Sequence, residues 1–294
     1  MVPRLALFLV LAGCAGPEIS PAPPGDSPLP DTGSVVPDFA DAEPEPTLSL
    51  DDLAVMVQRP FGAGSPNART LRDTYLGMMA MGDEACPGST TNITQDFVLG
   101  CTAPSGYYYS GVCMYGEIEV DDGVGGHTSI WGLGGDFELA YPDGATFAAG
   151  GGVTWEARTA ADGAQTFASN VRGTWQDLSQ QNWLGEGLSA LVDIYGGQTS
   201  EGAHYVTVDG GIAVGDVDLY FDTLTWDWSG PCAGAPTGAL RFRDTRGYWY
   251  VWTLGDDCDV CGEVVFHDDV PYGELCLDLT PLGGEIYYSN APEP

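Results

Sequence analysis

Lysine is absent from this sequence, and the nine basic residues, all arginine, stand against 42 aspartate and glutamate residues. The formal net charge of −33 at pH 7 excludes the positive surface that binds the phosphates of DNA or RNA, so we predict no nucleic-acid partner. The same deficit excludes a basic patch that attracts anionic lipid headgroups. An acidic surface favours solubility, cations and basic partners instead.

Short motifs of several enzyme classes are also missing. The chain contains no His-Glu-x-x-His zinc motif, no Gly-x-Ser-x-Gly nucleophile motif and no phosphate-binding Gly-Lys-Ser/Thr. The three histidines, His127, His204 and His267, have no spacing to a partner that indicates catalysis, and we interpret them as surface or strand-end residues. Acidic residues are too frequent for any carboxylate pair to indicate glycoside hydrolysis. We assign no catalytic residue.

The chain begins with an apolar segment that ends in a cysteine. Arg4 precedes an apolar run over residues 5–12, which has the length of a secretory signal. This run is too short to cross a bilayer, because a membrane-spanning helix needs about 20 apolar residues. Leu11-Ala12-Gly13-Cys14 completes it. These four residues resemble the lipobox of bacterial lipoproteins.

The resemblance implies that residues 1–13 are a signal peptide and that the Cys14 thiol carries lipid, with a further acyl chain on the new amino terminus. Several chains anchor a protein stably, because each buried methylene contributes about 0.8 kcal/mol. Ala15 stands where this family usually has aspartate for retention in the inner membrane, which favours the outer membrane. We therefore expect a lipid-anchored protein of the cell envelope that faces the periplasm or the exterior.

Residues 14–47 are rich in proline and acids and cannot bury enough apolar surface to fold, so we predict a disordered linker after the lipidated cysteine. Residues 48–85 predict a short helical segment. Ser49 is suited to cap a helix with acids in its first turn, and Pro60 ends that helix. A second helix is expected from residue 67 to residue 81.

Residues 86–294 predict a β domain, because short β-branched and aromatic runs alternate there with glycine-containing turns. Asp-Gly turns are expected at 142–144, 161–163 and 208–210, since such turns need positive φ, and a further turn is expected at 244–247. We predict an all-β fold. Its antiparallel meander forms a barrel-like, strongly curved or sandwich sheet, with one or two short N-terminal helices in front.

The chain has eight cysteines, and if Cys14 carries lipid an odd number remains. Export to an oxidising compartment favours disulfides, so the β domain is expected to be disulfide-stapled. We predict a bridge between Cys86 and Cys101, two bridges among Cys232, Cys258, Cys261 and Cys276, and Cys113 as a free thiol within a strand. Sequence alone leaves the connectivity open. The Cys-x-x-Cys pair also leaves open a zinc site or a redox site, although its flanks indicate turn and strand.

Calcium is the small partner that the composition favours, because it binds several oxygens from acidic side chains and carbonyls. The weak candidate ligands are Asp216, Asp218, Asp222, Asp256, Asp257 and Asp259. The first three share one face of an expected strand and would form a carboxylate ridge there. None of these acids matches the Asp-x-Asp-x-Asp-Gly calcium loop, and a non-specific acidic face explains them as well.

Three aromatic clusters, at 107–109, 226–228 and 248–250, place rings on both faces of their strands. A ring on an uncovered face would give a platform for a sugar or a protein, whereas a covered face would be core. We therefore expect a membrane-anchored extracytoplasmic binding, interaction or structural module for a protein or glycan ligand. The alternatives are a calcium-dependent adhesion module and an anchored hydrolase, in which one histidine or two carboxylates must converge in a pocket.

Overall fold

The computed structural model describes residues 45–61, 68–83, 85–87, 94–96, 100–179, 183–215, 217–255, 258, 260–267 and 270–292. The predicted signal peptide, Cys14 and most of the predicted linker lie outside the described residues. So do four of the six candidate calcium ligands, Asp216, Asp256, Asp257 and Asp259.

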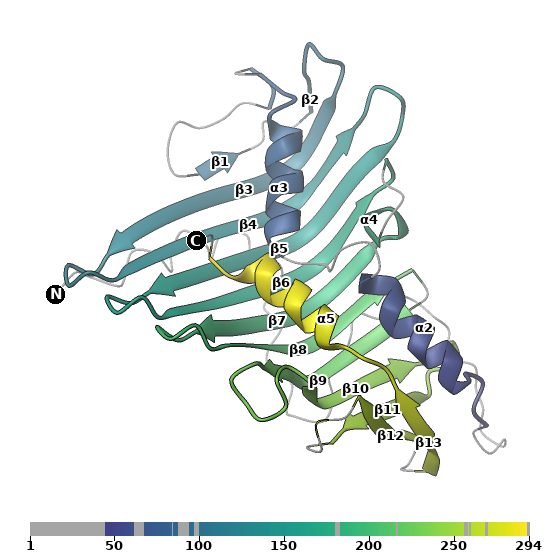
Figure 1. Cartoon of the computed structure of the whole chain (residues 1–294). Helices are drawn as coiled ribbons and strands as arrows, with labels where there is room; N and C mark the ends of the chain where they lie inside the picture. Colours follow the sequence, from purple (N-terminus) through teal and green to yellow (C-terminus); the bar gives the residue numbers. More distant parts are fainter. Residues whose placement is uncertain are drawn as a thin grey trace.

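One antiparallel sheet makes up most of the described chain (Figure 1). Its strands are β1 Thr94–Asp96, β2 Cys101–Thr102, β3 Tyr108–Asp121, β4 His127–Ala140, β5 Thr146–Thr159, β6 Gln165–Asp177, β7 Leu188–Gln198, β8 His204–Val214, β9 Val217–Asp227, β10 Pro236–Arg243, β11 Trp249–Leu254, β12 Cys261–Phe266 and β13 Val270–Cys276. From β3 onward the strands pair in chain order, while β1 and β2 both pair with β3. The predicted antiparallel meander is confirmed, as a single sheet whose order runs from β1 to β13 without closing.

The sheet is amphipathic because apolar and polar residues alternate along its long strands. In β5, Val153, Trp155 and Ala157 are buried, whereas Thr154 and Glu156 are exposed. Side chains two positions apart point to the same face of a strand, so this alternation creates one apolar face and one polar face. The apolar face needs a cover, and helices provide it.

Three helices lie on the apolar face: α2 Leu50–Phe61, α3 Ala68–Met79 and α5 Thr280–Asn290 (Figure 1). A single helical turn, α4 Trp183–Glu186, precedes β7. The two predicted N-terminal helices are confirmed as α2 and α3. Among the described helices, none combines the length and the apolar character that a membrane span requires.

Helix α5 corrects the prediction, which placed no helix after residue 86. Gly283 and Gly284 lower its helix propensity, whereas Pro281 stands in the first turn, where proline is well tolerated. Tertiary contacts explain why it forms. The indole N–H of Trp226 donates to the carbonyl oxygen of Leu279 at 3.0 Å, and that of Trp155 donates to the carbonyl oxygen of Asn290 at 2.8 Å. Two tryptophans of the sheet therefore hold both ends of α5.

A line of glycines crosses the sheet where β4, β5 and β6 pair. Gly135 lies opposite Gly151, which lies opposite Gly173, with φ values of 154°, 143° and 113°. A Cβ atom at any of the three would come within 2.2 Å of a carbonyl oxygen on the neighbouring strand. Only glycine fits there, and such positions let a sheet of long strands bend.

The predicted turn at 208–210 is wrong. These residues lie inside β8, where the pairing with β9 shifts between Val208 and Gly210. Gly210 has a φ of 105°, a conformation that bulges use as well as hairpin turns, so the Asp-Gly pattern did not distinguish the two. The other turns are confirmed: Gly144, Gly163 and Gly247 each donate their N–H to the carbonyl oxygen three residues earlier.

Three disulfides are present: Cys86–Cys101, Cys232–Cys258 and Cys261–Cys276. They confirm the predicted local bridge and the two late bridges, and they fix the connectivity that the sequence left open. The four late cysteines are all consumed by disulfides, so the pair at 258 and 261 has no thiolate for zinc. Disulfides indicate an oxidising, extracytoplasmic compartment. Cys113 is fully buried in β3 and is not part of these three bridges.

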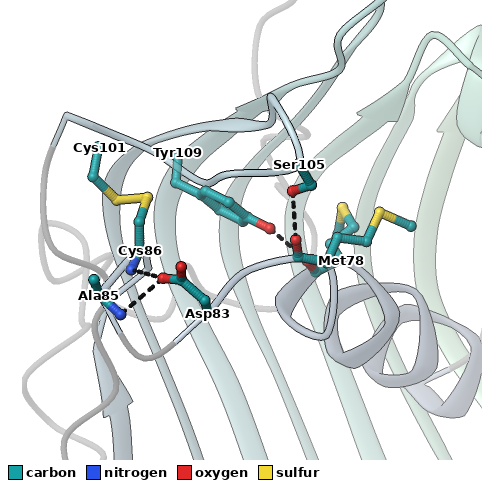
Figure 2. The surroundings of a disulfide bond; sticks show 8 residues. Met78, Asp83, Ala85, Cys86, Cys101, Ser105 and Tyr109 are labelled. Atoms are coloured by element: carbon teal, nitrogen blue, oxygen red, sulfur yellow. Dashed lines mark hydrogen bonds between the residues drawn. A yellow bond between two sulfur atoms is a disulfide. The ribbon is translucent and has the colours of Figure 1, made fainter.

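The first disulfide lies beside the contact between α3 and β3 (Figure 2). The hydroxyl of Tyr109 donates to the carbonyl oxygen of Met78 at 2.8 Å, and burial raises the pKa of Tyr109 to about 12. Asp83 accepts the N–H groups of Ala85 and Cys86, both at 2.8 Å. The C-terminal end of α3 is therefore fixed to the sheet by covalent and polar contacts.

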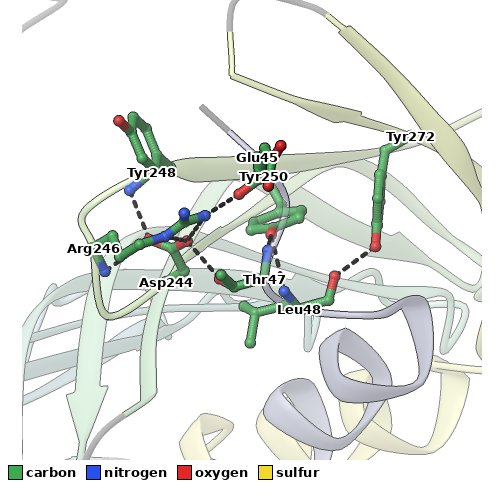
Figure 3. A network of polar contacts seen from close by, with 8 residues as sticks. All are labelled: Glu45, Thr47, Leu48, Asp244, Arg246, Tyr248, Tyr250 and Tyr272. Carbon is green, nitrogen blue, oxygen red and sulfur yellow. Dashed lines mark hydrogen bonds and ion pairs between the residues drawn. The ribbon is translucent and has the colours of Figure 1, made fainter. Parts of the chain in front are cut away.

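The first described residues are held against the turn between β10 and β11 (Figure 3). The N–H groups of Thr47 and Leu48 donate to the Tyr250 hydroxyl at 2.8 and 3.0 Å, and the Thr47 hydroxyl donates to the buried Asp244 carboxylate at 2.8 Å. Arg246 donates to the same carboxylate and to the carbonyl oxygen of Glu45. The linker was predicted to run to residue 47, but residues 45–47 already belong to the folded domain.

Packing of α5 on Trp226 predicts opposite effects for two adjacent glycines. A Cβ atom at Gly283 would lie 2.3 Å from the Trp226 indole, whereas one at Gly284 meets nothing within 4 Å. We expect Gly283→Ala to lower the free energy of unfolding by about 1–3 kcal/mol through overpacking. The matched control, Gly284→Ala, should raise it by about 0.5–1 kcal/mol through helix propensity. Urea unfolding measures both, and equal effects would contradict the docking of α5.

Candidate functional site

A pocket of about 300 Å³ opens at the ends of β3, β4 and β5, beside the first turns of α3. Five groups line it: two arginines from α3, a cluster of polar residues from β3 and β4, two tryptophans from β4 and β5, Ala157 and Thr159 from β5, and Pro292 after α5. Residues far apart in the sequence therefore meet at one place on the covered face of the sheet.

Two tryptophans form the floor of the pocket. Trp131 and Trp155 are directly opposite in the β4–β5 register, and their rings stack with centroids 6.0 Å apart and planes at 19°. Both are at least nine-tenths buried, and the guanidinium of Arg72 lies 5.3 Å from the Trp131 ring centroid. Because Trp155 also donates its N–H to Asn290, this floor cannot move without displacing α5.

Arg69 and Arg72 form one wall. They are three residues apart on α3, so both lie on the same helix face. Arg69 donates to the carbonyl oxygen of Ala291 at 2.5 Å, and the Nε–H of Arg72 donates to Asp73 at 3.1 Å. A guanidinium has five N–H donors, and the bond to Asp73 uses one of the five that Arg72 carries. Two arginines in one pocket are a marked local concentration in a chain with so few.

Four polar side chains meet on one hairpin, and Glu119, His127 and Ser129 form the facing wall of the pocket, whereas Asp121 contacts His127 from outside the lining. Asp121 pairs with His127 and Glu119 pairs with Ser129 in the β3–β4 register, which places all four on the same face. The imidazole contacts Asp121 through Nδ1 at 3.0 Å and Glu119 through Nε2. The Ser129 hydroxyl donates to the other oxygen of Glu119 at 2.7 Å.

The two carboxylates favour the protonated form of His127. The hydrogen bond to Asp121, followed by the bond and the charge of Glu119, raises the pKa of the imidazole above its ordinary value of 6.5. A protonated imidazole donates from both ring nitrogens, which matches a position between two carboxylates. When it is protonated, His127 therefore supplies a positive charge to this wall.

The arrangement is suited to binding more than to nucleophilic catalysis. A serine nucleophile needs its hydroxyl hydrogen-bonded to the base that activates it. Ser129 instead donates to Glu119, and both nitrogens of His127 face carboxylates. The pocket thus presents a wall of guanidinium donors and a wall with the Glu119 carboxylate across an aromatic floor.

The candidate calcium ligands within the described chain lie elsewhere. Asp222 contacts Arg241 at 2.5 Å, and Asp218 lies 4.0 Å from Arg243, on the uncovered face of β9 and β10. Burial raises the pKa of Asp218, and the charge of Arg243 acts in the opposite direction. The structure therefore places arginines beside the two acids, instead of the predicted open ridge of carboxylates.

Within the described residues, the ligand atoms of three metal-ligating groups all lie within 4.8 Å of one another only at Cys261, Glu274 and Cys276. Both sulfurs there belong to one disulfide, so this group does not offer a metal site.

The histidines and aromatic clusters are placed as follows. His204 stacks on Trp228 with ring centroids 4.6 Å apart, and His267 lies 4.9 Å from the Tyr248 ring. Both are strand-end histidines, as predicted. Trp226 and Tyr250 are fully buried, so the core interpretation of these two rings is confirmed.

Sequence reasoning missed Arg69, Arg72, Glu119 and Ser129, and it treated His127 as an ordinary surface residue. One signal was present. Acids at alternate positions end one expected strand, and His127 and Ser129 begin the next, so a tight hairpin would bring them together. The position of α3 above this hairpin had no sequence signal.

A second, more open hollow of about 620 Å³ lies near the glycine line. Its charged lining residues are Asp136, Glu138 and Glu186, with small and neutral residues between them. It lacks a cation, and it is less suited than the pocket beside α3 to select a ligand by charge.

Comparison of the chain with protein-family models, with curated proteins and with solved structures found no match. The assignment of the site therefore rests on its geometry and charge.

The position of His127 predicts a pH-dependent contribution to stability. Because its pKa is raised in the folded state, His127 stabilises the fold fully below about 6.5, and this contribution is lost as the pH rises through the folded-state pKa. Wild type and His127→Gln should therefore differ more in urea unfolding at acidic pH than at alkaline pH. The difference should vanish in a Glu119→Gln/Asp121→Asn background. A gap that does not change with pH would refute the ion contacts.

Proposed function

We propose that this protein is a lipid-anchored extracytoplasmic binding protein whose ligand occupies the pocket between α3 and the ends of β3–β5. The observation that carries the proposal is the convergence of Arg69, Arg72 and the His127 cluster around a stacked tryptophan pair. A concave site with an apolar floor and a few convergent polar groups is the usual form of a small-molecule site. The pocket size favours a small ligand over a protein surface.

The anchor and the pocket are compatible in position. In this proposal Cys14 carries the lipid, and the linker enters the domain at Glu45, which contacts the β10–β11 turn. The pocket lies at β3–β5, toward the other end of the sheet (Figure 1). The domain would then present its pocket away from the point of attachment. The outer membrane is the location that Ala15 favours.

An anchored hydrolase remains the second candidate, because His127 and two carboxylates do converge at the pocket. The contact of Ser129 with Glu119 rather than with the imidazole favours the binding function.

The anchor is tested by intact mass measurement of the protein extracted from membranes with detergent. We expect a chain that begins at Cys14 and carries added acyl mass. The Cys14→Ser variant should lose both the added mass and the membrane association. A chain that retains Met1 and carries no added mass would contradict the anchor.

The pocket is tested by native mass spectrometry of the protein purified under mild conditions. We expect a small bound molecule in the wild type that is released on denaturation and is absent from Arg72→Gln. The matched control is Arg172→Gln, because Arg172 is exposed on the uncovered face of β6. A molecule retained equally by both variants would place the ligand elsewhere.

A further inference from the structure

We infer that the pocket beside α3 selects a small zwitterion, such as a free amino acid, with the ligand carboxylate on the arginine wall and the ligand ammonium on the Glu119 carboxylate of the facing wall. This inference rests on the proposed binding function and adds the chemical class of the ligand. It uses the one feature that separates this pocket from other acidic surfaces of the chain, which is opposite charge on facing walls.

The arginine wall is suited to a carboxylate. A guanidinium is planar and always charged, and its paired N–H groups match the two oxygens of a carboxylate. Arg72 is fixed over Trp131 and against Asp73, so its side chain is already ordered before a ligand arrives. An ordered donor loses less conformational entropy on binding.

The opposite wall is suited to a cation, and the imidazole of His127 already lies there. His127 lies between Glu119 and Asp121, and each of its nitrogens contacts one carboxylate. When the imidazole loses its proton, the two carboxylates keep their charge and the wall gains one negative charge. A ligand ammonium, with three N–H donors, would then replace the imidazolium as the partner of Glu119, the carboxylate that lines the pocket.

This replacement makes ligand and proton compete. The charged groups that face His127 are Glu119 and Asp121 from β3 and the arginine pair from α3. The residues of β5 that line the pocket, Trp155, Ala157 and Thr159, are all uncharged. A zwitterion should therefore bind more tightly as the pH rises through the titration of His127, whereas a simple anion should bind more weakly.

The volume sets the size of the ligand. About 300 Å³ lies at the lower end of the range of small-molecule sites, which is roughly 300–1,000 Å³. An amino acid fits this limit, and its side chain would rest on the tryptophan floor. A long peptide or an oligosaccharide would extend beyond the pocket.

Calorimetric titration of the full chain in detergent tests the inference with three matched probes. Phenylalanine carries both charges, N-acetylphenylalanine carries only the carboxylate, and 2-phenylethylamine carries only the ammonium. We expect phenylalanine to bind at least about tenfold more tightly than either analogue, and more tightly at about pH 8 than at about pH 6. Glycine and leucine are titrated in parallel, so that the fit of one side chain does not decide the result.

Two variants and their controls locate the binding. Arg72→Gln and Glu119→Gln should each weaken phenylalanine binding by about tenfold or more. Arg172→Gln and Glu156→Gln change the same residue types on the exposed positions of β6 and β5 and should leave binding unchanged.

Each of the other outcomes would overturn the inference that the ligand is a zwitterion. If N-acetylphenylalanine binds as tightly as phenylalanine, tightens at low pH and is lost in Arg72→Gln, the pocket binds anions and the proposed function stands. If no amino acid binds at millimolar concentration, the ligand class is wrong. The bound molecule in native mass spectrometry then decides independently whether the pocket is a ligand site.

Discussion

The hydrogen bond from the Trp155 indole to the carbonyl oxygen of Asn290 connects the sheet, the last helix and the pocket. Trp155 is buried, so an unmade bond there would cost about 1–3 kcal/mol. The next carbonyl oxygen, that of Ala291, accepts from Arg69, and this bond joins α3 to the end of α5. These two bonds together fix where the two helices meet above the tryptophan floor.

Arginine is scarce in this molecule, so its positions determine which acidic residues have a cationic neighbour. Arg241, Arg243 and Arg246 lie beside Asp222, Asp218 and Asp244, and so neutralise acids within the turn and strands that carry them. Arg72 likewise contacts Asp73 of its own helix, but it lies together with Arg69 at a pocket whose facing carboxylate, Glu119, contacts His127. The strong negative charge elsewhere would repel an anion, so a ligand with a compensating ammonium suits the surroundings better than an anion alone.

Much of the fold follows from local patterns, and what does not follow depends on contacts between distant residues. Alternating strands and three of the four predicted turns are local features, and the structure contains them. The local pattern at 208–210 was ambiguous, since Gly210 serves a bulge. Helix α5 forms although Gly283 and Gly284 disfavour it, because Trp226 and Trp155 fix its ends. The spacing of the cysteines predicted which regions form disulfides. The pairing of Cys261 with Cys276, in contrast, depends on the register of β12 with β13.

The sequence indicated only one part of the candidate site, the hairpin residues. The hairpin that joins Asp121 to His127 brings four polar residues together through neighbouring chain positions alone. The two arginines lie on α3, roughly 50 residues before the hairpin in the chain. They meet the hairpin only because the helices cover one face of the sheet. Local patterns in the sequence therefore indicated the position of His127 at a strand end, but they did not indicate the pocket.

The titration of His127 followed by NMR, with and without a bound amino acid, tests the central claim most directly. The chain has only three histidines, so the imidazole signals can be assigned by single substitutions. The account predicts a pKa of His127 above the ordinary value in the free protein, which falls when phenylalanine binds, because the ammonium displaces the imidazolium from Glu119. A pKa that rises on binding, or one that does not respond to the ligand, would contradict it.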